Sequence, residues 1–419
     1  MRNKKGNVVI VGAGIGGLTL ALELHAAGVD CVLLEATQEL TELGVGINLL
    51  PHATRSLSRL GLQDALASVA VATKESVFFT RHGQLIYREP AGRAAGYDWP
   101  QFSIHRGDLQ RVLSAAVRDR LGTDAIRLGH RVTGFTQDDT AATVTVEHAD
   151  GSRSRVSGDV VVGADGVHSV VRMQLHPEAG VSHYTGYTMW RGTTVHPPFL
   201  SGGSMVRAGW LATGKLVAYP IRDNVDGNGS QLVNWLAEVE GPMRSQRDWT
   251  RRGYLEDFIE HFTDWQFDWL DVPALFRSAQ DIFEYPTVDS DPLPWWTQGR
   301  VTLLGDAAHP MVPRGSNGSA QAILDAKALA TLLAAAASSG ADSPKAALRA
   351  YDDERREATG LVVLTNRRNP PDALLREVYE RTGDQPFGSI SDVISAAEIA
   401  AMMSAYRNVA GYSAEHLRT

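Results

Sequence analysis

The sequence is poor in cysteine and lacks long apolar runs. Cys31 is the single cysteine among 419 residues. One thiol cannot form an internal disulfide or supply a cysteine-based zinc site, which is typical of a reducing cytoplasm. No stretch of about 18 uncharged apolar residues is present, so we expect no membrane-spanning helix. Residues 1–22 have a basic head and an apolar run, but their regular glycines and the lack of a small-residue cleavage site argue against a secretory signal.

An excess of positive charge is also absent. Forty Lys and Arg stand against 48 Asp and Glu, a formal net charge of −8. A mildly acidic chain has no global electrostatic reason to bind nucleic acid. Hydrophobic residues make up 43% and charged residues 21%, the balance of a globular protein, and the length predicts two or three compact units. We expect a cytoplasmic protein.

A dinucleotide-binding pattern occupies residues 7–35. The apolar run 7–11 predicts a buried parallel strand, residues 18–27 have helical periodicity, and residues 30–35 predict a second buried strand. Between them Gly12, Gly14 and Gly17 match G-x-G-x-x-G, which permits a tight turn, close approach of a pyrophosphate and close helix packing. Glu35 lies where a carboxylate can accept hydrogen bonds from ribose hydroxyls. The pattern predicts an adenine dinucleotide without distinguishing NAD from FAD.

Periodicity and turn signals predict the remaining elements. We expect helices at 48–70 (broken near Gly61), 105–121, 250–280, 320–337, 351–366 and in the last 50 residues, and strands within 75–104, 126–162, 183–240 and 301–309.

Signals of the nucleotide domain recur along the chain, with segments of another character between them. This favours two interleaved domains over two successive ones. We expect a discontinuous α/β, Rossmann-like domain formed by residues 1–75, 105–178 and 286–345. A strand-rich substrate domain would comprise 76–104 and 179–285, and 346–419 would form a helical C-terminal segment.

Two further motifs point to a family. Residues 159–172 (DVVVGADGVHSVVR) resemble the "DG" motif, and residues 305–310 (GDAAHP) the "GD" motif, of class A FAD-dependent aromatic hydroxylases, which are flavoprotein monooxygenases. With the N-terminal glycines, these motifs span residues 12–325 in the order that the family has. The resemblance implies a fold like that of para-hydroxybenzoate hydroxylase and FAD as cofactor.

The resemblance also implies where FAD binds. Asp306 would bind a ribitol hydroxyl, Arg106 would lie near the ribityl phosphate, and the backbone of 315–318, at a helix N-terminus, would face the pyrimidine edge of the flavin. Asp165 would help to form FAD and NAD(P)H contacts. The full set of residues expected to bind the cofactor is Gly12, Gly14, Ile15, Gly16, Gly17, Glu35, Gly46, Arg106, Val132, Asp165, Gly305, Asp306, Pro313, Gly315, Ser316, Asn317 and Gly318.

The loop at 313–321 departs from many relatives. It reads PRGSNGSAQ, so Asn317 stands where a glycine is frequent, and asparagine tolerates left-handed backbone geometry better than most residues. This loop and the tail at 366–394 most resemble the phenazine-type branch, the enzymes similar to 5-methylphenazine-1-carboxylate 1-monooxygenase. That branch is broad in substrate.

The chemistry implied by the resemblance belongs to the cofactor. NADH or NADPH, bound transiently because the sequence has no second G-x-G-x-x-G unit, reduces FAD. O₂ then forms a flavin C4a-hydroperoxide that hydroxylates an aromatic or N-heteroaromatic ring, with or without loss of a carboxyl group (an EC 1.14.13-type reaction). We expect no catalytic protein nucleophile and no metal. His309 is open to two interpretations, a base or a hydrogen-bonded structural histidine.

The substrate pocket is expected on the strand-rich segments. Its candidates are Trp190, Arg191, Tyr219, Trp235 and Pro313. Aromatic residues on strands more often belong to a core, and Arg191 could pair with a substrate carboxylate or support the sheet or the flavin loop. Two other functions stay open: another flavin reaction such as epoxidation, and a flavin-binding sensor without turnover. We expect a monomer or homodimer whose partners are a small aromatic substrate, O₂ and NAD(P)H.

Overall fold

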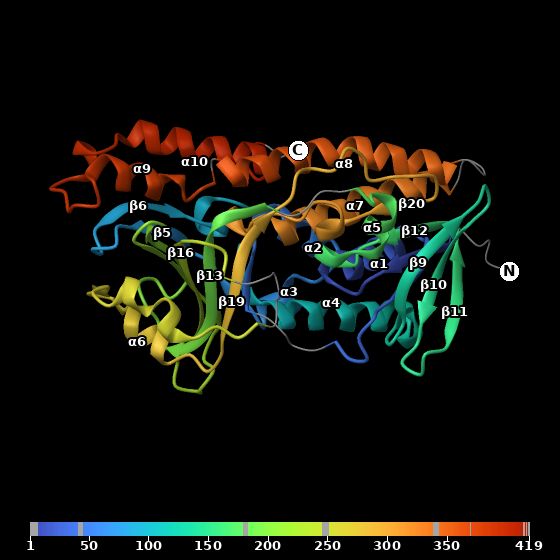
Figure 1. The fold of residues 1–419 in the computed structure, drawn as a ribbon, viewed down its shortest axis with the longest axis horizontal. Coiled ribbons are helices and arrows are strands. Elements are labelled where there is room, and N and C mark those ends of the chain that lie inside the picture. Colours follow the sequence, from blue (N-terminus) through green and yellow to red (C-terminus); the bar gives the residue numbers. More distant parts are fainter. Residues whose placement is uncertain are drawn as a thin grey trace.

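The protein has two lobes along its long axis, with C-terminal helices lying across both (Figure 1). The computed structural model describes residues 7–40, 45–178, 183–244, 251–337, 343–368, 370–413, 415 and 417. The expected domain boundary at 178–179 touches residues 179–182, which lie outside this set. The mixed α/β fold with a helical C-terminus is confirmed.

A parallel five-stranded sheet forms the centre of one lobe. Its strands are mostly apolar and buried on both faces, as the sequence runs predict, except at the exposed Asn7, Asp30 and Arg127. In spatial order they are β20 (Val301–Leu303), β12 (Val160–Gly163), β1 (Asn7–Val11), β2 (Asp30–Leu34) and β8 (Ile126–Arg127). The strand that precedes each of the three motifs therefore ends at the same edge of one sheet.

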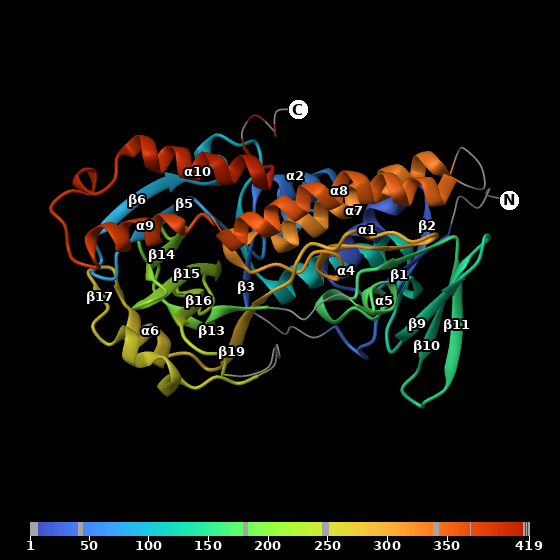
Figure 2. The ribbon, with the colours of Figure 1, turned by 45° about the horizontal axis from the view of Figure 1, so that its top comes forward.

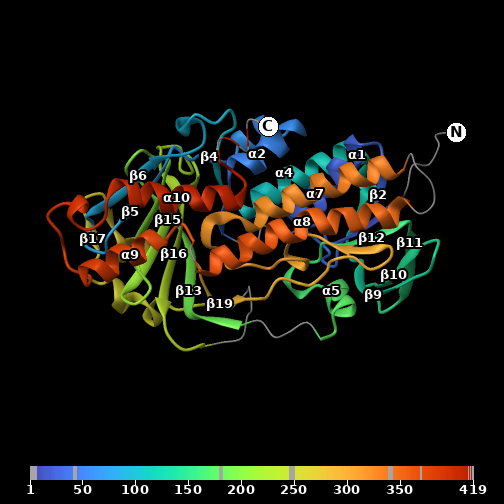
Figure 3. The same ribbon diagram turned by 90° about the horizontal axis from the view of Figure 1, so that it is seen from above.

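Helices cover this sheet. Figure 3 shows α7 between α1 and α8, and α4 on the far side of α1. Their bounds are α1 (Ile15–Ala26), α4 (Arg106–Leu121), α5 (Val170–Leu175), α7 (Gly318–Ala336) and α8 (Ser343–Arg368). Among the described residues, the segment Arg314–Ala336 is long and apolar enough to cross a membrane, but more than half of its apolar stretch is buried inside the protein. It therefore resembles the core helix of a globular fold.

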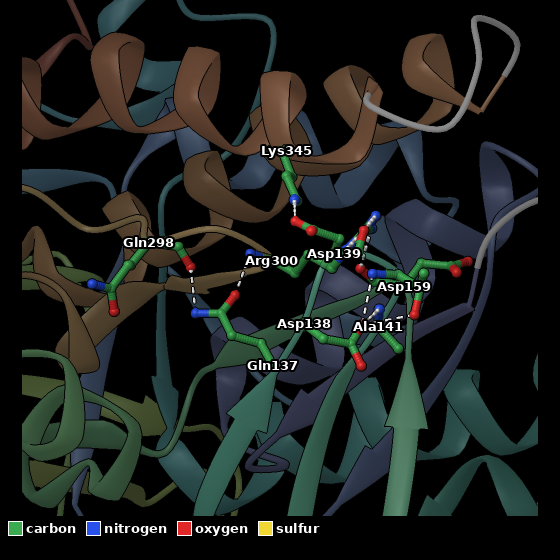
Figure 4. A network of polar contacts seen from close by, with 9 residues as sticks. Gln137, Asp138, Asp139, Ala141, Asp159, Gln298, Arg300 and Lys345 are labelled. Carbon is green, nitrogen blue, oxygen red and sulfur yellow. Dashed lines mark hydrogen bonds and ion pairs between the residues drawn. The ribbon is translucent and has the colours of Figure 1, made fainter.

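A polar network fastens a three-stranded antiparallel sheet to the parallel sheet (Figure 4). The small sheet comprises β9 (Arg131–Gln137), β10 (Ala142–Glu147) and β11 (Arg153–Gly158). Arg300 donates from its backbone to Gln137 Oε1 (2.7 Å) and from its guanidinium to the carbonyls of Asp139 and Asp159 (both 3.1 Å). Lys345 on α8 pairs with Asp139 (3.0 Å). The network fixes the residue that leads into β20 and the GD motif.

A seven-stranded sheet forms the other lobe. It is antiparallel except for the parallel pair β14–β5. In spatial order its strands are β19 (Ile282–Asp289), β13 (His183–His196), β16 (Gln231–Glu240), β15 (Gly214–Arg222), β14 (Ser204–Trp210), β5 (Glu75–Phe79) and β6 (Leu85–Pro90). One of its faces turns toward the parallel-sheet lobe.

The prediction of a helix over 250–280 is wrong. Within the described part, 251–280, this stretch contains short 3-10 turns, the pair β17 (Gln266–Phe267) and β18 (Leu270–Asp271), and one six-residue helix, α6 (Val272–Arg277). Its aromatic side chains, among them Phe258, Phe262 and Trp265, are buried against the outer face of the seven-stranded sheet. Packing of these large rings against the sheet therefore determines the backbone conformation of this stretch, in place of its local helical periodicity.

A small sheet and two short helices join the lobes. The sheet has the order β3 (Gly46–Leu49), β7 (Phe102–His105) and β4 (Val71–Ala72). The helix expected over 48–70 is split into α2 (Pro51–Arg59) and α3 (Gln63–Ala67), because Gly61 adopts a positive φ of 71° between them. Strand β3 carries Gly46 to the interface between the lobes.

The helices α9 (Ala373–Thr382) and α10 (Ala396–Ala410) pack on the lobe of the seven-stranded sheet. Figure 2 shows them beside β5 and β6. Their apolar side chains, including Leu374, Val378 and Met403, share a buried cluster with Phe78 and Ile86 of these strands. Residues from the end of the chain thus lie close to the region where the lobes meet.

Candidate active site

A cavity of about 290 Å³ lies between the motif loops of one lobe and the inner face of the seven-stranded sheet. It brings together most of the residues expected to bind a cofactor. Those that line it are Gly14, Ile15, Gly16, Gly46, Arg106, Gly305, Asp306, Pro313, Gly315, Ser316, Asn317 and Gly318. Three distant stretches of sequence therefore converge on one cavity.

The first glycine loop has the geometry that a pyrophosphate site requires. A Cβ on Gly17 would lie 2.1 Å from the carbonyl oxygen of Gly12, and Gly12 itself has a φ of 103°. A Cβ on Gly14 would meet nothing within 4 Å. Gly12 and Gly17 are therefore required by packing, whereas Gly14 leaves open space at the start of α1, where no side chain caps the helix. A phosphate fits this cradle.

Glu35 is held against the same loop. Its carboxylate accepts from the backbone N–H of Ala13 (2.9 Å) and from the backbone N–H (2.9 Å) and hydroxyl (3.0 Å) of Thr37. The side chain is half-buried and lies outside the cavity lining. Such an orientation suits a carboxylate that accepts hydrogen bonds from a ribose at the outer end of a long cofactor.

Asp165 holds a turn instead of facing the cavity. Its carboxylate accepts from the Ser169 hydroxyl (2.5 Å) and the Val170 N–H (2.8 Å), and burial raises its pKa. Its neighbours Ala164 and Gly166 line the cavity. Arg172, which the prediction did not include, donates to the carbonyls of Asp306 (3.1 Å) and Ala307 (3.2 Å) and so joins the DG and GD motifs.

Asp306 lies beside the N-terminus of α7, and both line the cavity. The Asp306 side chain is exposed, and its Oδ1 would lie 3.9 Å from a Cβ on Gly318. Asn317 is the N-cap of α7 but makes no side-chain cap hydrogen bond, so the first N–H groups of a 19-residue helix are left for another acceptor. A flavin pyrimidine edge is an acceptor of that kind.

Tyr406 of α10 fixes the loop before α7. Its hydroxyl donates to Asn366 Oδ1 (2.6 Å) and accepts from Asn317 Nδ2 (2.7 Å), which also donates to the Gly315 carbonyl (3.0 Å). Gly315 has a φ of 74°, and a Cβ there would lie 1.7 Å from the Tyr406 hydroxyl. Asn317 has a φ of −99°, so it does not take the left-handed geometry considered for it; Ser316 does, at 58°.

Three side chains of the seven-stranded sheet hold the backbone of Gly46. Arg191 Nη2 and the Tyr219 hydroxyl donate to its carbonyl (3.0 and 2.9 Å), and its N–H donates to Asn234 Oδ1 (2.7 Å). A Cβ on Gly46 would lie 2.6 Å from Ile221. Burial lowers the pKa of Arg191 and raises that of Tyr219 to about 12. Arg191 and Tyr219, both predicted for the substrate pocket, line the cavity, and each donates to Gly46, which was predicted to bind the cofactor.

Three predicted residues lie elsewhere. Trp190 and Trp235 are in the aromatic core on the outer face of the sheet, where Trp190 stacks on Phe258 at 5.2 Å. Successive residues on a strand point to opposite faces, so Trp190 and Arg191 cannot share a pocket, and Trp235 lies opposite Gly192 on the Trp190 face. Val132 is buried in β9, in the core of the other lobe. None of the three lines the cavity.

His309 belongs to a buried ion network. Its Nε2 lies 2.6 Å from Asp325 Oδ2, and Arg355 pairs with the other carboxylate oxygen at 2.8 Å. Burial alone would raise the pKa of Asp325, but His309 and Arg355 outweigh it and lower the pKa. Asp325 also accepts from the Gly305 N–H (3.2 Å). This arrangement favours the structural interpretation of His309, which supports the GD loop through the buried Asp325.

Charged residues on the sheet side of the cavity were missed by sequence reasoning. Lys215 on β15 lies between Glu238 on β16, at 2.5 Å, and Asp372, the N-cap of α9. Arg207 and Arg314 line the same wall. A signal was present, because Lys215 and Glu238 interrupt apolar strand sequences, and a charge inside a buried strand requires a partner or a ligand.

Comparison with known proteins identifies the family. The sequence profile of the FAD binding domain family matches residues 5–271 and 279–365. The chain belongs to this family. Its relatives include phenazine 1,6-dicarboxylic acid hydroxylase PhzS of Lysobacter antibioticus, 42% identical over 96% of this chain and 97% of that protein. Another is 3-amino-4-hydroxybenzoate 2-monooxygenase PtnB3 of Streptomyces platensis, 33% identical over 83% of each chain.

Solved structures agree in fold. Klebsiella pneumoniae HpxO, complexed with FAD and uric acid, superposes with a TM-score of 0.75 at 24% identity, covering 96% of each chain. This FAD-binding protein is therefore a class A flavoprotein monooxygenase, as its three motifs predict, and an FAD-dependent aromatic hydroxylase. Its cofactor is FAD, which the glycine cradle and the free start of α7 fit.

Proposed function

We propose that this flavoprotein uses NAD(P)H and O₂ to hydroxylate an aromatic or N-heteroaromatic compound that carries a carboxylate. The observation behind the proposal is one cavity in which the cofactor loops face a sheet wall rich in cations. Its relatives include a phenazine-dicarboxylic acid hydroxylase and an aminohydroxybenzoate monooxygenase, both named for acids. Where the hydroxylated carbon carries the carboxyl group, hydroxylation is accompanied by its loss.

The protein's part is to bind and orient. The glycine loop and Arg106 would bind the phosphates, Asp306 the ribityl chain, and the N–H groups at the start of α7 the pyrimidine edge of FAD. FAD, when bound, supplies the redox chemistry that activates O₂ with electrons from NAD(P)H. We assign no residue a nucleophilic role, and His309 and Asp325 stay behind the GD loop.

The substrate would lie between the flavin loop and the inner face of the sheet. Met189, Val217 and Leu236 line this part of the cavity with apolar surface. An apolar wall favours a planar ring and keeps bulk water from the reacting atoms. The wall is completed by charged side chains, which would orient an acidic substrate.

Turnover by the purified holoenzyme tests the proposal. We expect yellow protein whose oxidation of NADH or NADPH accelerates with an aromatic acid such as phenazine-1-carboxylate, and incorporation of one atom of labelled O₂ into the ring. Peroxide measured in parallel separates hydroxylation from uncoupled oxidation. An epoxide product would support the alternative flavin reaction. Fast FAD binding without reduction by either nicotinamide would support a sensor and contradict the proposal.

We further infer a cytoplasmic protein that acts as a monomer or homodimer. Its single cysteine has a pKa raised to about 12 by burial, so the thiolate is disfavoured. Size-exclusion chromatography with light scattering measures the oligomeric state directly.

A further inference from the structure

Five charged side chains, from the seven-stranded sheet, the loop before α7 and the start of α9, form one wall of the cavity beside Arg191. They are Arg207, Lys215, Glu238, Arg314 and Asp372. Three cations and two carboxylates give 3 − 2 = +1. Lys215 engages both carboxylates. Burial alone would raise the pKa of Asp372, but Lys215 and Arg314 outweigh it and lower the pKa to about 2, so Asp372 stays ionised. The wall therefore keeps its positive excess at neutral pH.

Arg314, like Arg207, forms no ion pair among the described residues, although both lie in this wall. No described residue accepts a hydrogen bond from the Nε of Arg314. Its guanidinium carbon lies 4.6 Å from the ring centre of Tyr187 and 5.9 Å from that of Trp210. Burial opposes the charge, but Asp372 and Tyr187 raise the pKa of Arg314, which is therefore charged. Arg314 is half-buried and lines the cavity, and its buried Nε has no acceptor within the described residues, so this donor is left for a ligand anion.

Three other arginines line the cavity: Arg106, which we assign to the FAD phosphates, and Arg191 and Arg207, which already have acceptors within the protein. Arg191 donates to the Gly46 carbonyl at 3.0 Å. Arg207 donates to the Ser76 hydroxyl at 2.6 Å, and its guanidinium carbon lies 5.2 Å from the ring centre of Phe78. Arg191 and Arg207 therefore have less to gain from a ligand than Arg314 has.

We propose that Arg314 binds the carboxylate of the aromatic substrate, an assignment that rests on the proposed function. One carboxylate brings the wall from +1 to neutral. Tyr187 and Trp210 hold the guanidinium plane, and Arg's fork-shaped donors suit a carboxylate. Lys215 is a positioning residue, because it binds the carboxylates that would otherwise pair with Arg314. Arg314 would thus bind the acid group from the loop that faces the flavin, where Pro313 and Gly315 flank it.

Paired ligands that differ in one charge test this assignment. Phenazine-1-carboxylate and phenazine-1-carboxamide are titrated into the FAD-loaded enzyme, and binding is read from the flavin absorption difference. We expect the wild type to bind the acid more tightly than the amide. A charge-assisted hydrogen bond contributes about 1.5–3 kcal/mol, so Arg314→Gln should weaken acid binding roughly 10- to 100-fold. Amide affinity and FAD content should be retained.

Two further variants sharpen the result. Arg314→Lys keeps the charge and should recover part of the preference for the acid. Arg207→Gln removes a neighbouring arginine of the same wall and should reduce that preference less than Arg314→Gln does. An unchanged acid-to-amide ratio in Arg314→Gln, or a larger loss in Arg207→Gln, overturns the assignment, as does a wild type without preference for the acid.

The binding assay separates this inference from the proposed function, because it needs no turnover. Acid binding that depends on Arg314 without oxygen incorporation would contradict the proposed function alone. Hydroxylation of aromatic acids with a ratio indifferent to Arg314 would contradict the assignment alone. If Arg314→Gln retained FAD but lost binding of both the acid and the amide, Arg314 would shape the pocket without distinguishing the charge of the ligand. That result would also overturn the assignment.

Discussion

His52, near the start of α2, is a buried neutral histidine beneath the flavin loop, and its replacement should change how stability depends on pH. The ring is 2% exposed, it stacks on Tyr412 at 5.5 Å, and neither nitrogen has a hydrogen-bond partner among the described residues. Burial, followed by the charge of Arg355, lowers its pKa to about 3. Folding therefore requires His52 to remain unprotonated throughout most of the acid range.

The sign and size follow from proton linkage. The folded pKa lies below the unfolded value, so the unfolded chain binds more protons and stability falls as the pH falls from 6.5 toward 3. At pH 5.5 the unfolded histidine is mostly protonated and the folded one is not, which costs about 1.4 kcal/mol relative to neutral pH. The loss is about 2.7 kcal/mol at pH 4.5 and levels off near the folded pKa.

The measurement is urea unfolding of the FAD-loaded protein at a fixed excess of FAD, at pH 7.5 and 5.5. His52→Phe keeps an aromatic ring against Tyr412. Between pH 7.5 and 5.5, its free energy of unfolding should fall by about 1.4 kcal/mol less than that of the wild type. His52→Leu should lose the same pH-dependent part, because neither residue titrates, whatever its effect on packing. If both variants retain the wild-type difference between the two pH values, His52 is not buried as a neutral ring.

Four other substitutions probe the cofactor site. Tyr406→Phe leaves Asn366 Oδ1 and an Asn317 N–H unpaired, and each unpaired buried group costs about 1–3 kcal/mol. FAD affinity, measured by fluorescence titration, should therefore fall by about tenfold or more. An affinity equal to that of the wild type would show that α10 does not hold the loop. Asp306→Ala should lower flavin retention after dialysis, and Glu35→Ala should do so more mildly; equal retention in all three proteins would contradict these contacts. Gly46→Ala should lower both thermal stability and flavin content, since its methyl group would lie 2.6 Å from a side-chain carbon.

Local patterns predicted the glycine turns and the buried strands of the parallel sheet, because these features depend on backbone geometry. Glycines that must avoid a Cβ, and strands buried on both faces, leave a sequence signal over a few residues. The family resemblance led us to expect Gly14, Arg106 and Asp306 at one cofactor, and all three line the same cavity. The family and the mixed α/β fold are confirmed by the comparisons.

The substrate half depends on pairing between distant segments, which no local pattern records. Choosing between Trp190 and Arg191 required knowing which face of β13 turns inward. The role of Lys215 depends on Glu238 across the sheet and on Asp372, 157 residues away. The aromatic stretch near Phe262 has the composition of a buried segment, but only the sheet it covers explains why it is not a long helix.

The parts that enclose the flavin loop come from opposite ends of the sequence. The phosphate cradle forms around Gly14, whereas Asp372 and Tyr406 are translated hundreds of residues later. A nascent chain released before these residues emerge would possess the nucleotide cradle without the support for its catalytic end. We therefore expect chains cut before Tyr406 to retain every family motif and yet to hold FAD weakly, because the Gly315–Asn317 loop would lose the side chain that fixes it.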